Sequence, residues 1–205
     1  MRVTRAAGAW LGLFGGLFWA AKALYDWLGL ERQVHRGYPP SDATDYIEFI
    51  VPLLCIGTMA AVAKRYGAAA GVMPLVVSIG LGLTAAFHAS ETYLLHSSIP
   101  FGLVFFLTGH LILLAGTIVL AVRIGRAEDG RRPFSRCLYI LFAAILALCL
   151  SPAIKDSLPG EAVTGITVSL MTTIGILWAA LGAALIADGA RRPDSNPEET
   201  KRFSL

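Results

Sequence analysis

Six long apolar stretches, separated by short polar connections, constrain the fold of this chain more than any other feature of its sequence. Each stretch is near the roughly 20 residues that an α-helix needs to cross about 30 Å of hydrocarbon. Backbone groups in lipid need partners inside the protein, so such stretches are expected to be helices. A composition of 56% hydrophobic and 15% charged residues is typical of a membrane protein. The expected helices span residues 6–30, 44–63, 70–97, 101–122, 134–152 and 162–186.

The expected architecture is all-α, with a single polytopic domain at residues 1–190 that forms a six-transmembrane-helix bundle. The basic N-terminal residues and the apolar run after them are similar to a signal peptide, but we interpret this run as the first helix of the bundle. Residues 191–205 are mostly polar and contain two prolines. We therefore predict a disordered cytoplasmic tail there.

Lysine and arginine residues collect on one side of the predicted bundle and indicate its orientation. Six crossings bring both termini to the same side, which would hold 13 of the 17 basic residues. Because basic loops stay on the cytoplasmic side, we predict both termini in the cytoplasm (N-in, C-in) and a plasma (inner) membrane location. The basic loops then specify topology and no nucleic-acid binding is expected. The 13 residues are Arg2, Arg5, Lys64, Arg65, Arg123, Arg126, Arg131, Arg132, Arg136, Arg191, Arg192, Lys201 and Arg202.

Ionisable residues inside the apolar stretches fall mainly in the other half of the bilayer, away from the basic loops. A charged side chain at the centre of a membrane helix costs roughly 2.5–3.5 kcal/mol on insertion scales, so it usually faces a cavity, a partner or a functional site. The pattern predicts an outward-facing polar pocket. Its candidate ligand-binding residues are Lys22, Asp26, Glu48, His88, Glu91 and His110.

The spacing of these residues places some of them together. His88 lies about ten residues before the turn near residue 98 and His110 about eleven after it, so in an antiparallel hairpin the two imidazoles reach the same depth, roughly 15 Å. Glu91 follows His88 by three residues and shares its helix face. Lys22 and Asp26 are separated by four residues, which suits a salt bridge or a gate of opposite charges.

Two cofactor chemistries could use the histidines, and we favour neither. His88, His110 and Glu91 are candidate metal ligands, since imidazole and carboxylate groups bind zinc, iron or manganese, but the sequence contains no HExxH motif. Haem could bind between the two histidines, although directly adjacent helices leave little room for a porphyrin. A third chemistry needs no cofactor, because a buried carboxylic acid beside a histidine can transfer protons.

Three functions remain open at this point, and no motif identifies a family. The leading hypothesis is a pocket that binds a small molecule or lipid, in a sensor, accessory subunit or uptake component. The first alternative is an intramembrane enzyme that acts on a lipid or isoprenoid, with or without the assistance of a metal ion. Its catalytic residues would be Glu91, His88 and Glu48. The second is a structural or assembly subunit, in which the Gly8, Gly12 and Gly16 face packs against another helix and supports a homo- or hetero-oligomer.

Overall fold

The computed structural model describes residues 2–33, 45–94, 100–127, 133–151 and 159–191, and this part of the chain folds into six helices with no strand. The predicted all-α bundle is therefore confirmed. The helices are α1 (Arg2–Gln33), α2 (Asp45–Tyr66), α3 (Met73–Leu94), α4 (Pro100–Ala127), α5 (Pro133–Leu150) and α6 (Gly160–Arg191).

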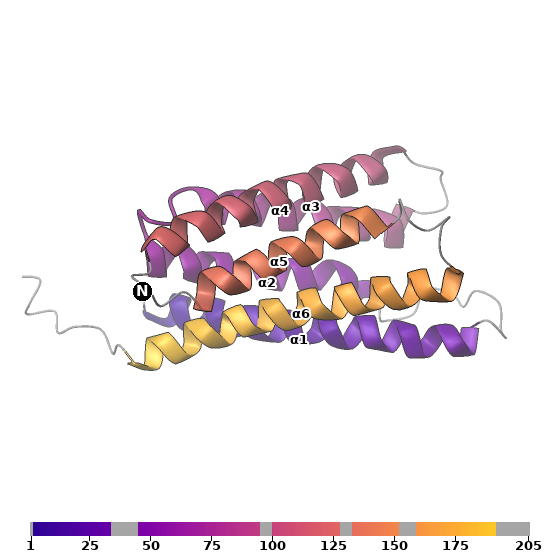
Figure 1. Ribbon diagram of the computed structural model, residues 1–205, viewed down its shortest axis with the longest axis horizontal. Coiled ribbons are helices and arrows are strands. Elements are labelled where there is room, and N and C mark those ends of the chain that lie inside the picture. Colours follow the sequence, from indigo (N-terminus) through magenta and orange to yellow (C-terminus); the bar gives the residue numbers. More distant parts are fainter. Residues whose placement is uncertain (1, 34–44, 95–99, 128–132, 152–158, 192–205) are drawn as a thin grey trace, which may run out of the picture.

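The six helices run along the long axis of the molecule (Figure 1), and their pairwise contacts close into a ring. Each helix packs against its neighbours in sequence, and α6 returns to pack against α1. Helices α2 and α6, which are not neighbours around the ring, also contact each other. Short connections favour antiparallel packing of neighbouring helices, which explains why sequence neighbours are also neighbours in space.

The start of α1 and the end of α6 lie at the same end of the bundle, as an ion pair between Arg5 and Asp188 shows. The end of α2 joins them through Arg65, which also contacts Asp188. A ring contact between Tyr66 and Phe134, with centroids 5.4 Å apart, brings the start of α5 to the same place. We call this the basic end of the bundle, because Arg5, Arg65 and further basic residues of α4 and α5 lie there.

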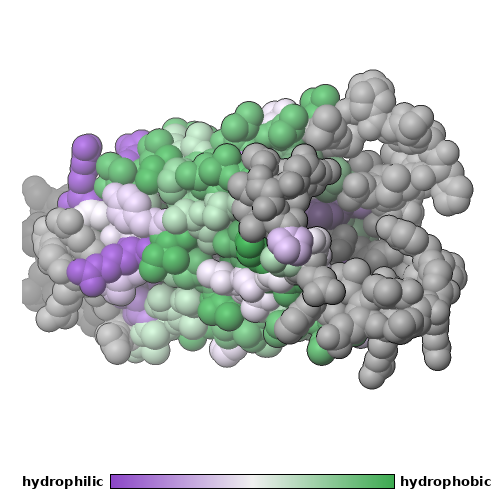
Figure 2. Space-filling model, turned by 45° about the vertical axis from the view of Figure 1, so that its right-hand side comes forward, coloured by the Kyte–Doolittle hydropathy of each residue, from purple (hydrophilic) through white to green (hydrophobic). Residues whose placement is uncertain are grey.

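The outer surface of the bundle is apolar. Many large hydrophobic side chains point outward, among them Leu111, which is 65% exposed. On the face shown in Figure 2, hydrophobic residues cover the middle of the molecule and hydrophilic residues lie at one end. Soluble domains rarely expose apolar patches of this extent to water, whereas lipid chains solvate an apolar surface. Five helices, α1, α2, α4, α5 and α6, contain stretches long and apolar enough to cross a membrane, and the described apolar stretch of α3, Met73–Ala89, is shorter.

The core lies inside the ring and takes side chains from all six helices. Trp178 of α6, Met59 of α2 and Leu141 of α5 are among its fully buried members. Ala9, Leu81 and Leu120 extend the same cluster to the remaining three helices. Side chains from all six helices therefore fill the interior of the helix ring.

Glycine allows α1 to approach both of its neighbours closely. A Cβ added at Gly16 would lie 2.5 Å from the carbonyl oxygen of Gly175 and 2.8 Å from the Cα of Ala179, both in α6. Gly8 and Gly12 lie against α2, where Gly12 faces Thr58. The glycine face predicted to pack against another helix thus makes close contacts with two helices of its own chain. Its use between copies of the chain stays a prediction.

The α3–α4 hairpin, which carries both candidate histidines, packs in the same way. A Cβ at Gly80 would lie 2.8 Å from the backbone nitrogen of Leu113 and 3.0 Å from the carbonyl oxygen of Gly109. A Cβ at Gly116 would lie 2.9 Å from a methyl carbon of Val77. Small residues at such positions let helix backbones approach, which fixes the register of the two helices.

The helix ends differ from the predicted ones for physical reasons. Helices α1 and α6 extend beyond the predicted apolar runs at both ends. The length of an apolar run reflects the thickness of the hydrocarbon layer, whereas the helical hydrogen bonds continue into the polar residues on either side. Helix α3 begins at Met73, later than the predicted residue 70. The preceding connection is a turn in which Gly67 and Gly71 have φ values of 47° and 59°, a left-handed conformation that glycine adopts without strain.

Candidate functional site

The structure describes three of the six candidate pocket side chains. Lys22 lies in α1, His88 in α3 and His110 in α4. The other three candidates, Asp26, Glu48 and Glu91, fall on helical backbone, and their side chains lie outside the described residues. The roles predicted for these three acids therefore stay predictions, because their side chains lie outside the described residues.

His110 is buried in the bundle, with 8% of its surface exposed. Its Nδ1 lies 2.8 Å from the carbonyl oxygen of Phe106, one turn earlier in α4. A carbonyl can only accept, so Nδ1–H is the donor, and in the neutral imidazole the lone pair is then on Nε2. The ring also packs against that of Phe106, with centroids 4.2 Å apart. Helix α4 thus fixes the ring and leaves Nε2 as its acceptor.

His88 approaches His110 across the α3–α4 interface. Phe87, the residue before His88, contacts Phe106 with ring centroids 5.1 Å apart. The His88 ring packs edge-on against that of Phe87. Two histidines from different helices therefore flank one aromatic contact inside an apolar hairpin.

Lys22 is the third described candidate and is only 9% exposed. At a rise of about 1.5 Å per residue it lies about 25 Å further along α1 than Arg5, so it is far from the basic end of the bundle. An ammonium group in hydrocarbon is costly and needs polar surroundings. Its burial places one ammonium group inside the half of the bundle opposite the basic end.

Metal binding gains no geometric support from the residues that can be seen. The described ranges contain no group of three or more His, Cys, Asp or Glu side chains that could hold a metal ion. Of the predicted ligands, His88 and His110 are described, and the side chain of Glu91 is not. The structure thus contributes two nearby imidazoles and does not test the third ligand.

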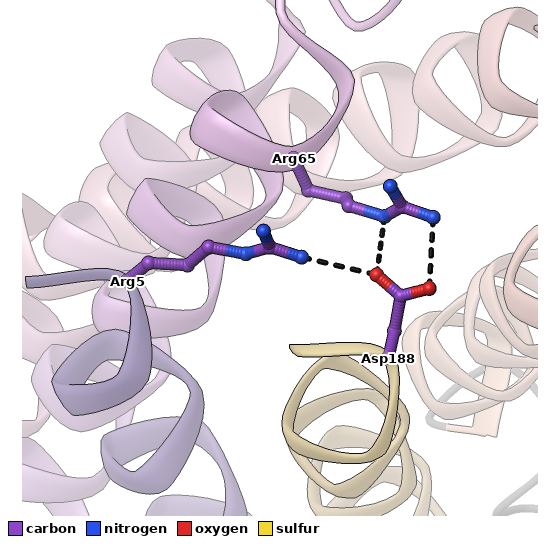
Figure 3. A network of polar contacts seen from close by, with 3 residues as sticks. All are labelled: Arg5, Arg65 and Asp188. Carbon is purple, nitrogen blue, oxygen red and sulfur yellow. Dashed lines mark hydrogen bonds and ion pairs between the residues drawn. The ribbon is translucent and has the colours of Figure 1, made fainter. Parts of the chain in front are cut away.

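A second polar cluster, which the sequence analysis did not single out, lies at the basic end (Figure 3). Arg65 of α2 contacts both carboxylate oxygens of Asp188 of α6, at 2.7 and 2.9 Å. Arg5 of α1 donates to the same carboxylate at 3.0 Å. We call these three residues the arginine–aspartate cluster. The available signal was Asp188 itself, an acid at the end of an apolar run and shortly before Arg191 and Arg192.

The fold and its apolar surface place the chain among helical multi-pass membrane proteins. Comparison with protein-family models, curated proteins and solved structures gives no match to this chain. Its function must accordingly be inferred from its own residues.

Proposed function

We propose that all six helices cross the membrane and that the basic end faces the cytoplasm. Helix α3 has 22 residues, which at about 1.5 Å each is enough for the roughly 30 Å of hydrocarbon. Basic residues collect at the end where α1 starts and α6 ends, and such ends stay in the cytoplasm. Reporter fusions after α3 and after α6 test this. The proposal requires an external signal after α3 and a cytoplasmic one after α6.

We further propose that the half of the bundle opposite the basic end binds a small molecule or lipid. The observation that carries this proposal is the burial of Lys22 and His110 within apolar helices. Structural packing alone would favour apolar side chains at such positions, because titratable groups in hydrocarbon carry a free-energy cost. A bound polar group would add to the contacts that these two side chains make within the chain.

The described side chains indicate what the ligand offers. Lys22 supplies hydrogen-bond donors and a positive charge, which suit a carboxylate, phosphate or carbonyl group. Nε2 of His110 accepts a hydrogen bond, which suits a hydroxyl or amide donor. In this proposal Asp26, Glu48 and Glu91 complete the polar region. The ligand class is therefore an amphipathic molecule with a polar group at one end.

The fixed tautomer of His110 also favours a second candidate, proton transfer on a bound lipid or isoprenoid. Because Nδ1–H is held by Phe106, the Nε2 atom is available as a base and would return the proton in a later step. His88 and Glu91 would take part as partners. Turnover separates this enzyme from a binding protein, since only an enzyme loses product formation in Glu91→Gln while keeping its ligand.

The test is the set of molecules that purify with the full chain in nanodiscs made directly from the cell membrane. Wild-type protein is compared with Lys22→Met and His110→Phe, and bound molecules are identified by mass spectrometry. Leu111→Ala is the matched control, because Leu111 is the neighbour of His110 and points outward. We expect a species that both site variants lose and the control keeps. Identical profiles in all four folded proteins would contradict the proposal.

A further inference from the structure

The arginine–aspartate cluster contains more positive than negative charge. The guanidinium groups of Arg5 and Arg65 converge from two helices on the single carboxylate of Asp188 (Figure 3). The bidentate contact of Arg65 occupies both oxygens, and Arg5 adds one contact to an oxygen already in use. Arginine stays protonated in proteins. One guanidinium charge is therefore left without a matching carboxylate inside the cluster.

Hydrogen bonding in the cluster is also incomplete. The Nε atom of Arg5 is shielded from solvent, and within the described residues it has no hydrogen-bond partner. A shielded donor without a partner destabilises the fold, which marks the surroundings of Arg5 as rich in unmatched donors. The side chains of the cluster are between 22% and 29% exposed, which leaves them accessible from outside. An anionic acceptor at the exposed parts of the two guanidinium groups would balance the excess charge.

The position of the cluster along the membrane normal suits a lipid headgroup. Trp10 of α1 is 46% exposed and stacks on Phe14, with ring centroids 5.7 Å apart. Exposed tryptophan is enriched where a membrane helix meets the headgroup region. Arg5 lies about 7.5 Å further toward the helix start, at about 1.5 Å per residue. The arginines are then level with lipid phosphates.

We propose that Arg5 and Arg65 bind a phosphate group at the basic end of the bundle, from an anionic phospholipid or from free phosphate. Guanidinium groups recognise phosphate through parallel N–H···O contacts, and two of them from different helices form a small cradle. Asp188 competes with the phosphate for the same donors. This site is separate from the polar region of Lys22 and His110, and it depends on neither ligand binding nor catalysis there.

The experiment titrates the detergent-purified full chain with phosphatidylglycerol or phosphatidylcholine and counts bound lipid by native mass spectrometry. Arg5→Gln should weaken phosphatidylglycerol binding by roughly fivefold, the effect of one basic residue near a membrane surface. Asp188→Asn should strengthen it, because the competing carboxylate is lost. Arg136→Gln is the matched control, since Arg136 is an exposed arginine near the start of α5. It should change binding little.

Two outcomes would overturn the proposal. Equal losses in Arg5→Gln and Arg136→Gln would mean that the effect is one of general surface charge. Weaker binding in a folded Asp188→Asn protein would mean that the cluster only joins helices. If Asp188→Asn does not fold, the comparison of Arg5→Gln with Arg136→Gln decides alone. A parallel titration with inorganic phosphate at constant ionic strength identifies the source: displacement of bound phosphatidylglycerol at low concentration supports free phosphate, and its retention supports the lipid.

Discussion

The two polar regions of this bundle use charged and titratable groups in opposite ways. At the basic end, Arg5, Arg65 and Asp188 come from three helices and contact one another directly, so they join α1, α2 and α6. In the other half, His110 donates a hydrogen bond to a carbonyl of its own helix. This bond connects no two helices, and it fixes the orientation of the imidazole. The difference indicates that the basic end contributes to assembly of the ring, whereas the opposite half presents polar groups inside it.

The largest expected effect comes from a change that disturbs both regions at once. Helix α1 carries Arg5 and Lys22, and Gly16 between them lies against the backbone of α6. Gly16→Ala should lower the free energy of unfolding by about 2–3 kcal/mol, because backbone on the facing helix leaves no room for the methyl group. Unfolding in mixed micelles measures this.

Gly82→Ala is the control for that change, since a Cβ at Gly82 would meet nothing within 4 Å. Alanine is the better helix former by about 1 kcal/mol, so this variant should be as stable as the wild type or slightly more so. Equal destabilisation by both alanines would refute the close α1–α6 packing.

A smaller effect is expected when only the basic end is changed. Arg65→Met removes the bidentate contact and leaves Asp188 with Arg5 alone. We expect a loss of about 1–2 kcal/mol in unfolding free energy, because the carboxylate is partly buried and loses its better partner. Arg136→Met, which removes an exposed arginine, should cost less than about 0.5 kcal/mol. Similar values for the two would show that the cluster does not join the helices.

Changing the opposite half should affect stability still less. His110→Phe keeps a planar ring in the same place and removes one hydrogen bond within α4. The expected loss of unfolding free energy is below about 1 kcal/mol. Ligand retention, measured on the same preparation, should nevertheless be lost. A variant that is strongly destabilised would make His110 a structural residue and remove the contrast between the two regions.

The smallest effect separates the regions by salt. Raising the ionic strength from about 0.1 to about 1 M shortens the Debye length to about 3 Å. Because the arginine–aspartate cluster is partly exposed, this screening weakens its ion pairs. We expect a decrease of a few tenths of a kcal/mol in wild-type unfolding free energy. The decrease should be smaller in Arg65→Met, which keeps only the Arg5–Asp188 pair, and unchanged in His110→Phe. Equal salt sensitivity in all three proteins would contradict the assignment.

Much of the fold could be predicted from the sequence, because apolar runs of membrane length leave the backbone little choice but helix. Six runs gave six helices. The matched depths of His88 and His110, predicted from helical rise alone, stay a prediction. Lateral neighbours were harder, since six similar runs do not say which helix lies beside α1. That information is in contacts such as Gly16 against Gly175, which are distant in sequence.

The candidate site was less predictable for the same reason. The arginine–aspartate cluster joins residues near both ends of the chain, and basic residues at helix ends read first as topological signals. Asp188 becomes informative only when α6 is known to lie beside α1 and α2. The predicted roles of Asp26, Glu48 and Glu91 stay predictions, because they depend on side chains outside the described residues.

The closed ring has a consequence for biosynthesis. Five of the six neighbour contacts join helices that are consecutive in sequence, so they can form as each hairpin leaves the translocon. The contact between α1 and α6 is different, because α6 is the last of the six helices to be synthesised. Until then, the side of α1 that contains Gly16 and later faces α6 has no partner helix within the chain. A nascent chain that stalls before α6 would therefore leave this side of α1 uncovered, with α1 packed against α2 alone.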